Sequence, residues 1–210
     1  MTGKLTPSEL LANPWAFGPW CYQIGEVLCL PTPIKVPRGM LGMWPLTTDV
    51  QTVIRHQLGI TDLDHVVVER GFTLQQPFAT AIAGYQRPDG QWEEGPKRIE
   101  NRPKPVLGRV MPKGGLWLAI HAGKALYPNA EEIVADWRGE GSPFVPSNRH
   151  TWSEFDIPDE GELPDPNWEL WMQSPLLHDM PRSAILGVMR VDHCLAYDAT
   201  SAGIPRGVLL

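Results

Sequence analysis

The segment KRIENR, residues 97–102, holds side chains whose types and spacing suit the binding of an anion or the transfer of a proton. Lys97 can hold a phosphate or a base carbonyl, or it can pass a proton if burial lowers its pKa. Glu100 can accept hydrogen bonds from the amino edge of a base or orient Lys97, and Arg102 offers a planar fork for a phosphate or carboxylate. On a regular strand Lys97 and Glu100 lie on opposite faces, so they meet only if the chain turns, as the preceding Gly-Pro dipeptide favours. The alternative is a surface charge network without a ligand.

Five further residues are candidates for ligand binding. His121 ends an apolar run and precedes Ala-Gly-Lys, where small residues let the backbone approach a ligand and Lys124 can reach an anion. Gln76 lies at the start of a predicted helix, whose N-terminal amides favour an anion. Trp20 and Trp44 can stack on bases. Except for Lys124, each has a structural alternative: a core histidine, an ordinary amphipathic helix, or core packing of the two indoles.

The composition favours a folded, β-rich chain. The chain has 210 residues, 42% of them hydrophobic and 20% charged, which suits one domain. Its 22 prolines and 20 glycines predict many turns and short elements. The net charge of −6 argues against a protein that coats a phosphate backbone without specificity. However, residues 97–124 hold seven basic residues and one acidic residue, whereas residues 125–180 hold twelve acidic residues and two arginines. Such asymmetry can focus an anion on one face, although solvated charges without a partner are the alternative.

Cysteine usage and hydropathy bear on the compartment and on metal binding. Cys21, Cys29 and Cys194 form no C-x-x-C pair, so reduced thiols are expected. No apolar run approaches the roughly 20 residues of a membrane helix, and the N-terminus lacks a signal pattern, which predicts a cytoplasmic protein. His193 and Cys194 are adjacent on a predicted strand and point to opposite faces, so no metal site is expected. The sequence has no Walker loop or paired-glycine dinucleotide motif, so no cofactor is expected either.

Local patterns predict alternating short helices and strands. A capping box of Thr6 and Glu9 predicts a helix over residues 6–12, and Thr48 and Gly59 bound a helix over 47–58. We expect strands at 21–24, 26–30, 64–69, 97–102, 116–121 and 183–195, and helices at 75–84 and 129–138. The motif HAGK after residue 120 is expected to turn, residues 85–96 to form a loop tip, and residues 141–181 to form an acidic Pro/Trp-rich arm.

Four blocks in order, LQQPFATAIAG, KRIENR, GLWLAIHAGK and AILGVMRVDHC, resemble the ASCH domain, a PUA-like β-barrel family linked to RNA. The family hallmark Gly-x-Lys-x-x-Glu-x-Arg is matched by Gly95, Lys97, Glu100 and Arg102. The resemblance covers residues 72–194 apart from the acidic arm. It implies an α+β fold, a small PUA-like β-barrel with peripheral helices, and a pocket lined by Lys97 and Glu100.

Two departures from the family pattern affect the architecture. Residues 85–96 intervene before the motif lysine, so either Gly84 or Gly95 can be the motif glycine. The segment 13–46 resembles the one that normally closes an ASCH domain, yet here it comes first. We therefore predict a circular permutation, which domains tolerate because their termini often lie close together.

The permutation predicts a single domain over residues 1–210. In it, residues 13–46 complete a barrel formed by 63–140 and 182–195, residues 47–62 bridge the old ends, and 141–181 form an arm or lid. The chain is then a monomer, or a domain-swapped dimer that exchanges the same segment.

The resemblance implies binding of single-stranded RNA or of a modified nucleotide through Lys97, Glu100 and Arg102. One alternative is a hydrolase in which Lys97 and Glu100 are catalytic. ASCH amidohydrolases that act on acetylated cytidine carry a threonine at the position of Glu100, and a carboxylate cannot replace that hydroxyl, so RNA cleavage is the better enzymatic alternative. The third possibility is an adaptor whose acidic arm, residues 141–181, binds a protein partner.

Overall fold

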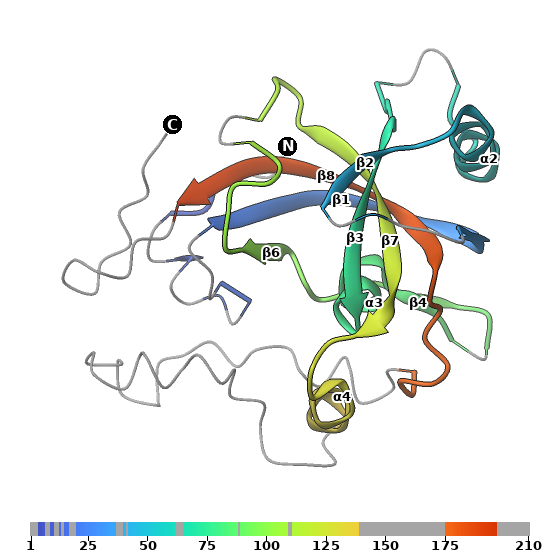
Figure 1. The fold of residues 1–210 in the computed structure, drawn as a ribbon, viewed down its shortest axis with the longest axis vertical. Helices are drawn as coiled ribbons and strands as arrows, with labels where there is room; N and C mark the ends of the chain where they lie inside the picture. Colours follow the sequence, from blue (N-terminus) through green and yellow to red (C-terminus); the bar gives the residue numbers. More distant parts are fainter. Residues whose placement is uncertain are drawn as a thin grey trace.

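A curled six-stranded sheet forms a half-barrel and organises the chain (Figure 1). The computed structural model describes residues 4–6, 9–10, 13, 15–16, 20–36, 40, 42–61, 65–87, 89–108, 111–138 and 175–196. Across the sheet the order is β2 (Met43–Pro45), β3 (Arg70–Gln76), β7 (Leu116–Leu126), β8 (Ala184–Ala196), β1 (Trp20–Lys35) and β6 (Ile99–Arg102). β3 and β7 are parallel, and the other neighbouring pairs are antiparallel. The α+β class predicted from the sequence is confirmed.

Both faces of the sheet are buried, because alternate residues of its central strands enter different cores. In β7, Leu118 and Ile120 belong to the core that α3 (Phe78–Ala83) helps to form. Trp117 and Ala119 belong to the opposite core, where α2 (Thr48–Leu58) contributes the fully buried Ile54. A third apolar cluster contains the N-terminal Trp15 together with residues of α3 and of α4 (Ala130–Trp137). The near-continuous apolar runs of β7 and β8 reflect this two-sided burial.

The N-terminal segment lies inside the sheet. β1 pairs along most of its length with β8, and its first residues pair with β6, so Trp20 lies opposite Arg102. β2 pairs with β3. Of the segment 13–46 that the sequence assigned to closing the barrel, β1 therefore lies between β8 and β6, the strand that carries Glu100, whereas β2 lies at the opposite edge of the sheet.

Helix boundaries follow the capping signals in the sequence, with one correction. Thr6 and Glu9 make the reciprocal hydrogen bonds of the predicted capping box. Thr47, and not Thr48, caps α2, since its hydroxyl accepts a hydrogen bond from the amide of Val50. Gly59 ends the same helix with φ 63°, as expected of a left-handed C-cap.

Three strand and turn predictions were wrong. Residues 66–69 form no strand, and β3 begins at Arg70, because a β-branched run needs a pairing partner as well as propensity. The HAGK motif does not turn, since β7 continues to Leu126 beside its parallel partner β3. Gln76 belongs to β3, and α3 starts only at Phe78.

Residues 85–96 contain a hairpin instead of an irregular loop tip. β4 (Tyr85–Gln86) pairs antiparallel with β5 (Trp92–Glu93) beside α3 (Figure 1). Gly84 and Gly95 meet at its base, where a Cβ on Gly84 would lie 3.0 Å from the amide nitrogen of Gly95. The two ends of the hairpin therefore lie close together, and the segment that carries Lys97 and Glu100 follows directly after it. Gly84 has φ 84°, so its conformation also favours glycine.

Candidate functional site

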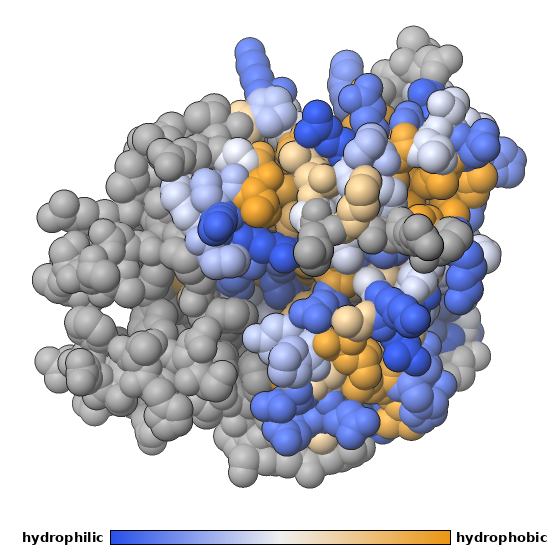
Figure 2. Space-filling model, viewed as in Figure 1, coloured by the Kyte–Doolittle hydropathy of each residue, from blue (hydrophilic) through white to orange (hydrophobic). Residues whose placement is uncertain are grey.

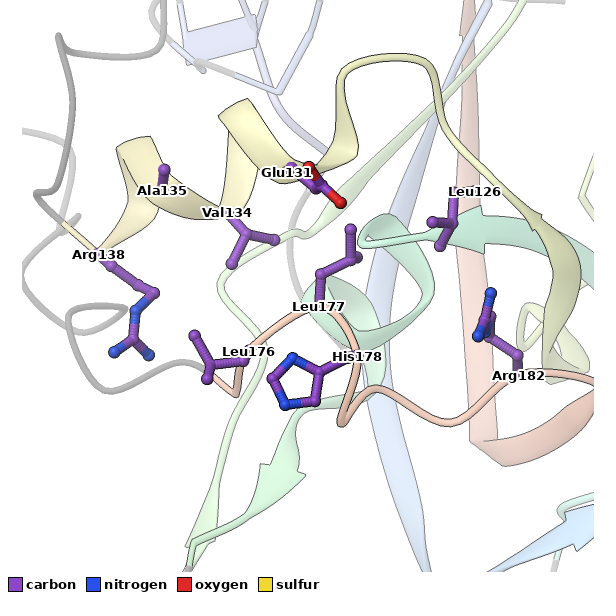
Figure 3. Close-up of a pocket in the computed structure, with 9 residues that line it drawn as sticks. All are labelled: Leu126, Glu131, Val134, Ala135, Arg138, Leu176, Leu177, His178 and Arg182. Atoms are coloured by element: carbon purple, nitrogen blue, oxygen red, sulfur yellow. The ribbon is translucent and has the colours of Figure 1, made fainter.

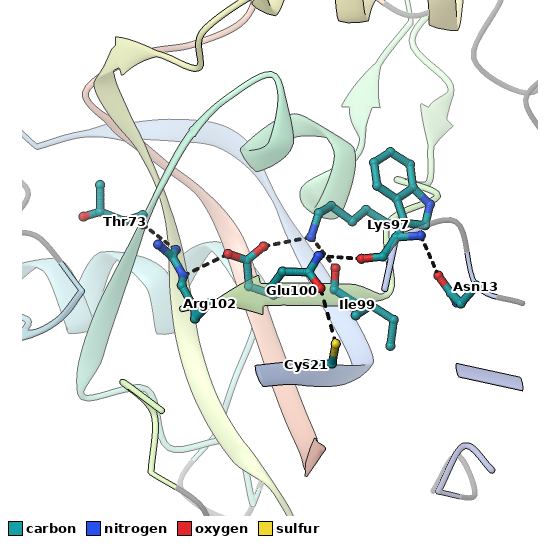
Figure 4. Close-up of polar contacts among 9 residues, drawn as sticks. Asn13, Cys21, Thr73, Lys97, Ile99, Glu100 and Arg102 are labelled. Atoms are coloured by element: carbon teal, nitrogen blue, oxygen red, sulfur yellow. Dashed lines mark hydrogen bonds and ion pairs between the residues drawn. The ribbon is translucent and has the colours of Figure 1, made fainter. Parts of the chain in front are cut away.

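A buried lysine–glutamate ion pair lies at the start of β6 (Figure 4). Lys97 Nζ is 2.8 Å from Glu100 Oε2, and it also donates a hydrogen bond to the carbonyl of Ile99. The two charged side chains are only 2% and 7% exposed. They converge because Lys97 precedes the regular strand, and its amide donates to the carbonyl of Ala81 in α3 at 2.9 Å. The chain bends at Pro96, and Lys97 meets Glu100 as the sequence allowed.

Aromatic rings enclose the ammonium group of Lys97. The rings of Trp15 and Phe78 each have their centroids 5.9 Å from Nζ, and Trp137 packs edge-on against both rings. Burial lowers the pKa of Lys97, while the charge of Glu100 and its hydrogen bond act in the opposite direction. The lysine therefore lies in an environment that favours its neutral form more than water does.

Arg102 is the most exposed member of the triad. Its Nε lies 3.0 Å from Glu100 Oε1 without hydrogen-bond geometry, and its Nη2 donates to the carbonyl of Thr73 at 3.1 Å. The guanidinium lies 4.4 Å from the ring centroid of Phe72. The side chain is 24% exposed, so Arg102, Glu100 and Lys97 form a series of increasing burial. Trp20, half-buried, lies opposite Arg102 in the β1–β6 pairing.

Thr73 joins this triad to two other predicted residues. Its hydroxyl lies 3.1 Å from His121 Nδ1 and accepts a hydrogen bond from Trp44 Nε1 at 3.0 Å. Trp44 also packs edge-on against the imidazole. Burial lowers the pKa of His121, while a hydrogen bond with the backbone of Val36 acts in the opposite direction. His121 and Trp44 are thus core residues linked to the site through Thr73, which agrees with the structural alternative for each.

The remaining predicted residues, Gln76 and Lys124, lie apart from the triad. Gln76 is fully buried, where its Oε1 accepts from the amide of Thr80 and its Nε2 donates to the carbonyl of Pro181. Among the N-terminal backbone amides of α3 that the sequence offered to an anion, that of Thr80 is therefore already bonded to Gln76, and α3 has only six residues. Lys124 is exposed near the end of β7.

The structure adds four residues that the sequence analysis did not assign to the site: Trp15, Phe72, Thr73 and Phe78. Their rings and carbonyl enclose the three charges. Asn101 holds Trp15 in place by donating to its carbonyl, and also accepts a hydrogen bond from the thiol of Cys21. Only one feature of the sequence pointed to this enclosure. Successive residues of a strand point to opposite faces, so Asn101 was expected to face away from Glu100.

Two clefts lie elsewhere on the described chain. One, of about 410 Å³, lies between α4 and the turn before β8 (Figure 3). Leu176 and His178 of the turn and Arg138 of the helix end are among its lining residues. The other, of about 230 Å³, lies at the base of the β4–β5 hairpin. Neither is lined by a member of the charged triad. The arm predicted at 141–181 lies outside the described residues as far as Ser174.

The surface of the described chain is mixed in polarity. On the face shown in Figure 2, apolar side chains gather in patches separated by hydrophilic ones. None of the helices in the described ranges is both long enough and apolar enough to cross a membrane. Within the same ranges no group of three or more His, Cys, Asp and Glu side chains is placed to hold a metal ion. The three cysteines, all of them described, form no disulfide.

Comparison with known proteins adds no assignment. The chain matches no protein-family model, and it shows no significant match to a curated protein or to a solved structure. Its function must therefore be inferred from the site itself.

Proposed function

We propose that this chain binds single-stranded RNA, or a modified nucleotide, through Lys97, Glu100 and Arg102. The observation that carries the proposal is the buried Lys97–Glu100 pair, enclosed by aromatic rings and extended by Arg102 toward solvent. Removing two charges from water costs several kcal/mol per ion, and well-packed apolar residues often stabilise a fold as well or better. The presence of such a pair is best explained if its charges serve a ligand.

The half-exposed end of the triad supports the binding of a nucleotide. A guanidinium has five N–H donors, and the only hydrogen bond described for Arg102 goes to Thr73. Its remaining donors suit a phosphate, which it can hold in a bidentate manner. Trp20 lies opposite Arg102 on β1, partly packed against the core, and the part of its indole that stays exposed can contact a base. Glu100 then reads an amino edge, and Lys97 behind it supplies positive charge.

We also propose that the chain is a circularly permuted ASCH-like domain of PUA-like architecture. The first support is that β1 lies between β8 and β6 in the sheet, while α2 lies between β2 and β3 in chain order. The second support is the hairpin, which lies between α3 and the motif lysine in the chain and leaves the residues of the motif together. Gly95 packs on α3, where a Cβ would lie 2.3 Å from the carbonyl oxygen of Ala81. Gly84 is constrained as tightly, since a Cβ there would lie 2.2 Å from the carbonyl oxygen of Glu93, so either glycine can be the motif glycine.

One observation favours a second function, that of a hydrolase acting on RNA or on a modified nucleoside. Burial lowers the pKa of Lys97, which brings the lysine closer to a proton-transfer role at neutral pH. In this alternative Lys97 and Glu100 provide proton transfer, and Arg102 stabilises the developing negative charge.

A binding and turnover experiment separates the two functions. Fluorescence anisotropy measures the affinity for a labelled single-stranded RNA of about eight nucleotides, and chromatography detects cleavage of that RNA or of modified nucleosides. The variants are Lys97→Ala and the control Lys35→Ala, which removes an exposed lysine from the opposite end of β1. Binding without turnover, lost only in Lys97→Ala, supports the binding protein, and turnover lost in the same variant supports the hydrolase. A Lys97→Ala protein that is folded and matches the parent in every assay rejects the site.

A further inference from the structure

The cleft at the base of the hairpin has a neutral, apolar interior and a charged rim. Val27 of β1 and Ile82 of α3 are among its apolar lining residues, and the indole of Trp92 forms part of the wall. Trp92 is 39% exposed although it is large and apolar. The thiol of Cys29 donates to the carbonyl of Ala83, and burial raises its pKa to about 12, so it stays uncharged at neutral pH. The cleft thus offers an aromatic surface beside a hydrophobic floor.

The rim presents a hydrogen-bond donor next to an acceptor. Arg98 Nη2 lies 3.2 Å from Glu94 Oε2, and both residues line the cleft. Arg98 Nη1 is buried and has no hydrogen-bond partner among the described residues. A buried N–H group without a partner is costly, so a ligand acceptor placed there recovers that cost. Because Glu94 neutralises Arg98, the rim favours a neutral ligand over an anionic one.

We propose that this cleft binds a single nucleobase stacked against Trp92. A base carries an acceptor and a donor on adjacent atoms, which match Arg98 Nη1 and the carboxylate of Glu94. The volume of about 230 Å³ is large enough to admit one heterocyclic base. Stacking on an aromatic side chain provides affinity for any base.

The cleft is separate from the Lys97–Glu100–Arg102 site. Its lining residues include Arg98 and none of Lys97, Glu100 and Arg102. The base can come from a free nucleoside or from a nucleotide next to the one that the triad holds. The inference does not depend on the function proposed for the triad, and the experiment treats the two separately.

Calorimetric titration with guanosine, adenosine, cytidine and uridine tests the cleft, with benzoate as an aromatic anion for comparison. We expect at least one nucleoside to bind, benzoate to bind more weakly, and Trp92→Ala to weaken the nucleoside by about fivefold or more. Trp92→Phe keeps a ring and should retain most of the affinity. Gln91→Ala, a matched control on the same hairpin outside the cleft lining, should leave binding unchanged.

The proposal is overturned if no nucleoside binds the parent protein, or if Trp92→Ala and Arg98→Gln, both folded by circular dichroism, bind as the parent does. An RNA titration distinguishes the two sources of the base. Weaker RNA binding in Trp92→Ala identifies a base of the RNA strand, whereas unchanged RNA binding with a lost nucleoside site identifies a free nucleoside. Lys97→Ala should abolish RNA binding and leave nucleoside binding at the cleft intact, so failure of one site is not failure of the other.

Discussion

Two ion pairs between a basic residue and a glutamate lie within the seven residues 94–100 and differ in burial and in surroundings. Lys97 and Glu100 are almost fully buried at 2.8 Å, whereas Arg98 and Glu94 are 34% and 85% exposed at 3.2 Å. The first pair lies against aromatic rings, and the second lies on the rim of a cleft open to solvent. Their charges are the same, so the difference lies in solvation.

The comparison shows that burial, and not charge alone, decides how much an ion pair affects stability. An exposed pair is screened by water and is typically worth about 0–1 kcal/mol, so the Arg98–Glu94 ion pair contributes little to the stability of the fold. A buried pair must overcome desolvation, and removal of one partner leaves the other charge uncompensated at a cost of about 3–5 kcal/mol. We therefore expect a large loss of stability when the buried pair is broken and a small one when the exposed pair is broken.

The largest effect is expected for Lys97→Met. This change leaves Glu100 buried with only Arg102 as a charged partner, and we expect a loss of about 3 kcal/mol in the free energy of unfolding, measured in urea. Adding Glu100→Gln to the same chain removes the uncompensated charge and should recover most of that loss. A Lys97→Met chain as stable as the parent would contradict the assigned burial of the pair.

Gly95→Ala should have the next largest effect, because Gly95 lies between the two pairs and packs on α3. A Cβ there would lie 2.3 Å from the carbonyl oxygen of Ala81, so the backbone must shift at a cost of about 1–3 kcal/mol. Gly90, at the hairpin tip, has open space around it and only its φ of 83° opposes substitution. Gly90→Ala should therefore cost about 1 kcal/mol. Equal losses in thermal denaturation would show that Gly95 is not sterically constrained.

The pH dependence of stability should reveal the burial of the Cys29 thiol, which lines the same cleft as Arg98 and Glu94. Burial raises the pKa of Cys29 from 9.0 to about 12, so the stability that it contributes is complete below pH 9 and is lost as the pH rises toward 12. The stability difference between the parent and Cys29→Ala should be constant at neutral pH and should shrink above pH 9. A difference that does not change up to pH 11 would place the thiol in contact with water.

The smallest effect is expected for Glu94→Gln. We expect a change within about 0.5 kcal/mol in the free energy of unfolding, and a smaller one in high salt, because the pair is exposed and screened. A loss of stability as large as that of Lys97→Met would show that burial does not distinguish the two pairs.

The sequence predicted the parts of this molecule that depend on local chemistry. Gly59 as a C-cap, the capping box of Thr6 and Glu9, and the meeting of Lys97 with Glu100 all follow from residue types a few positions apart. The pairing of β1 with β8 is the observation on which the permutation proposal rests.

The errors came from interactions between distant parts of the chain. Val66–Val68 has strand propensity but no pairing partner, and the HAGK motif stays extended because β3 pairs beside it. His121 and Gln76 looked available to a ligand, yet Thr73 occupies the first and the amide of Thr80 and the carbonyl of Pro181 occupy the second. The aromatic enclosure of Lys97 could not be predicted, because Trp15 lies more than eighty positions from it in the chain.

The most direct test of the central claim is to measure stability and binding together in the double variant Lys97→Met/Glu100→Gln. If the buried pair serves a ligand, its unfolding free energy in urea should be within about 1 kcal/mol of the parent, or above it. Its affinity for single-stranded RNA and for the modified nucleosides should nevertheless be lost. A stable double variant that binds these ligands as tightly as the parent would contradict the account.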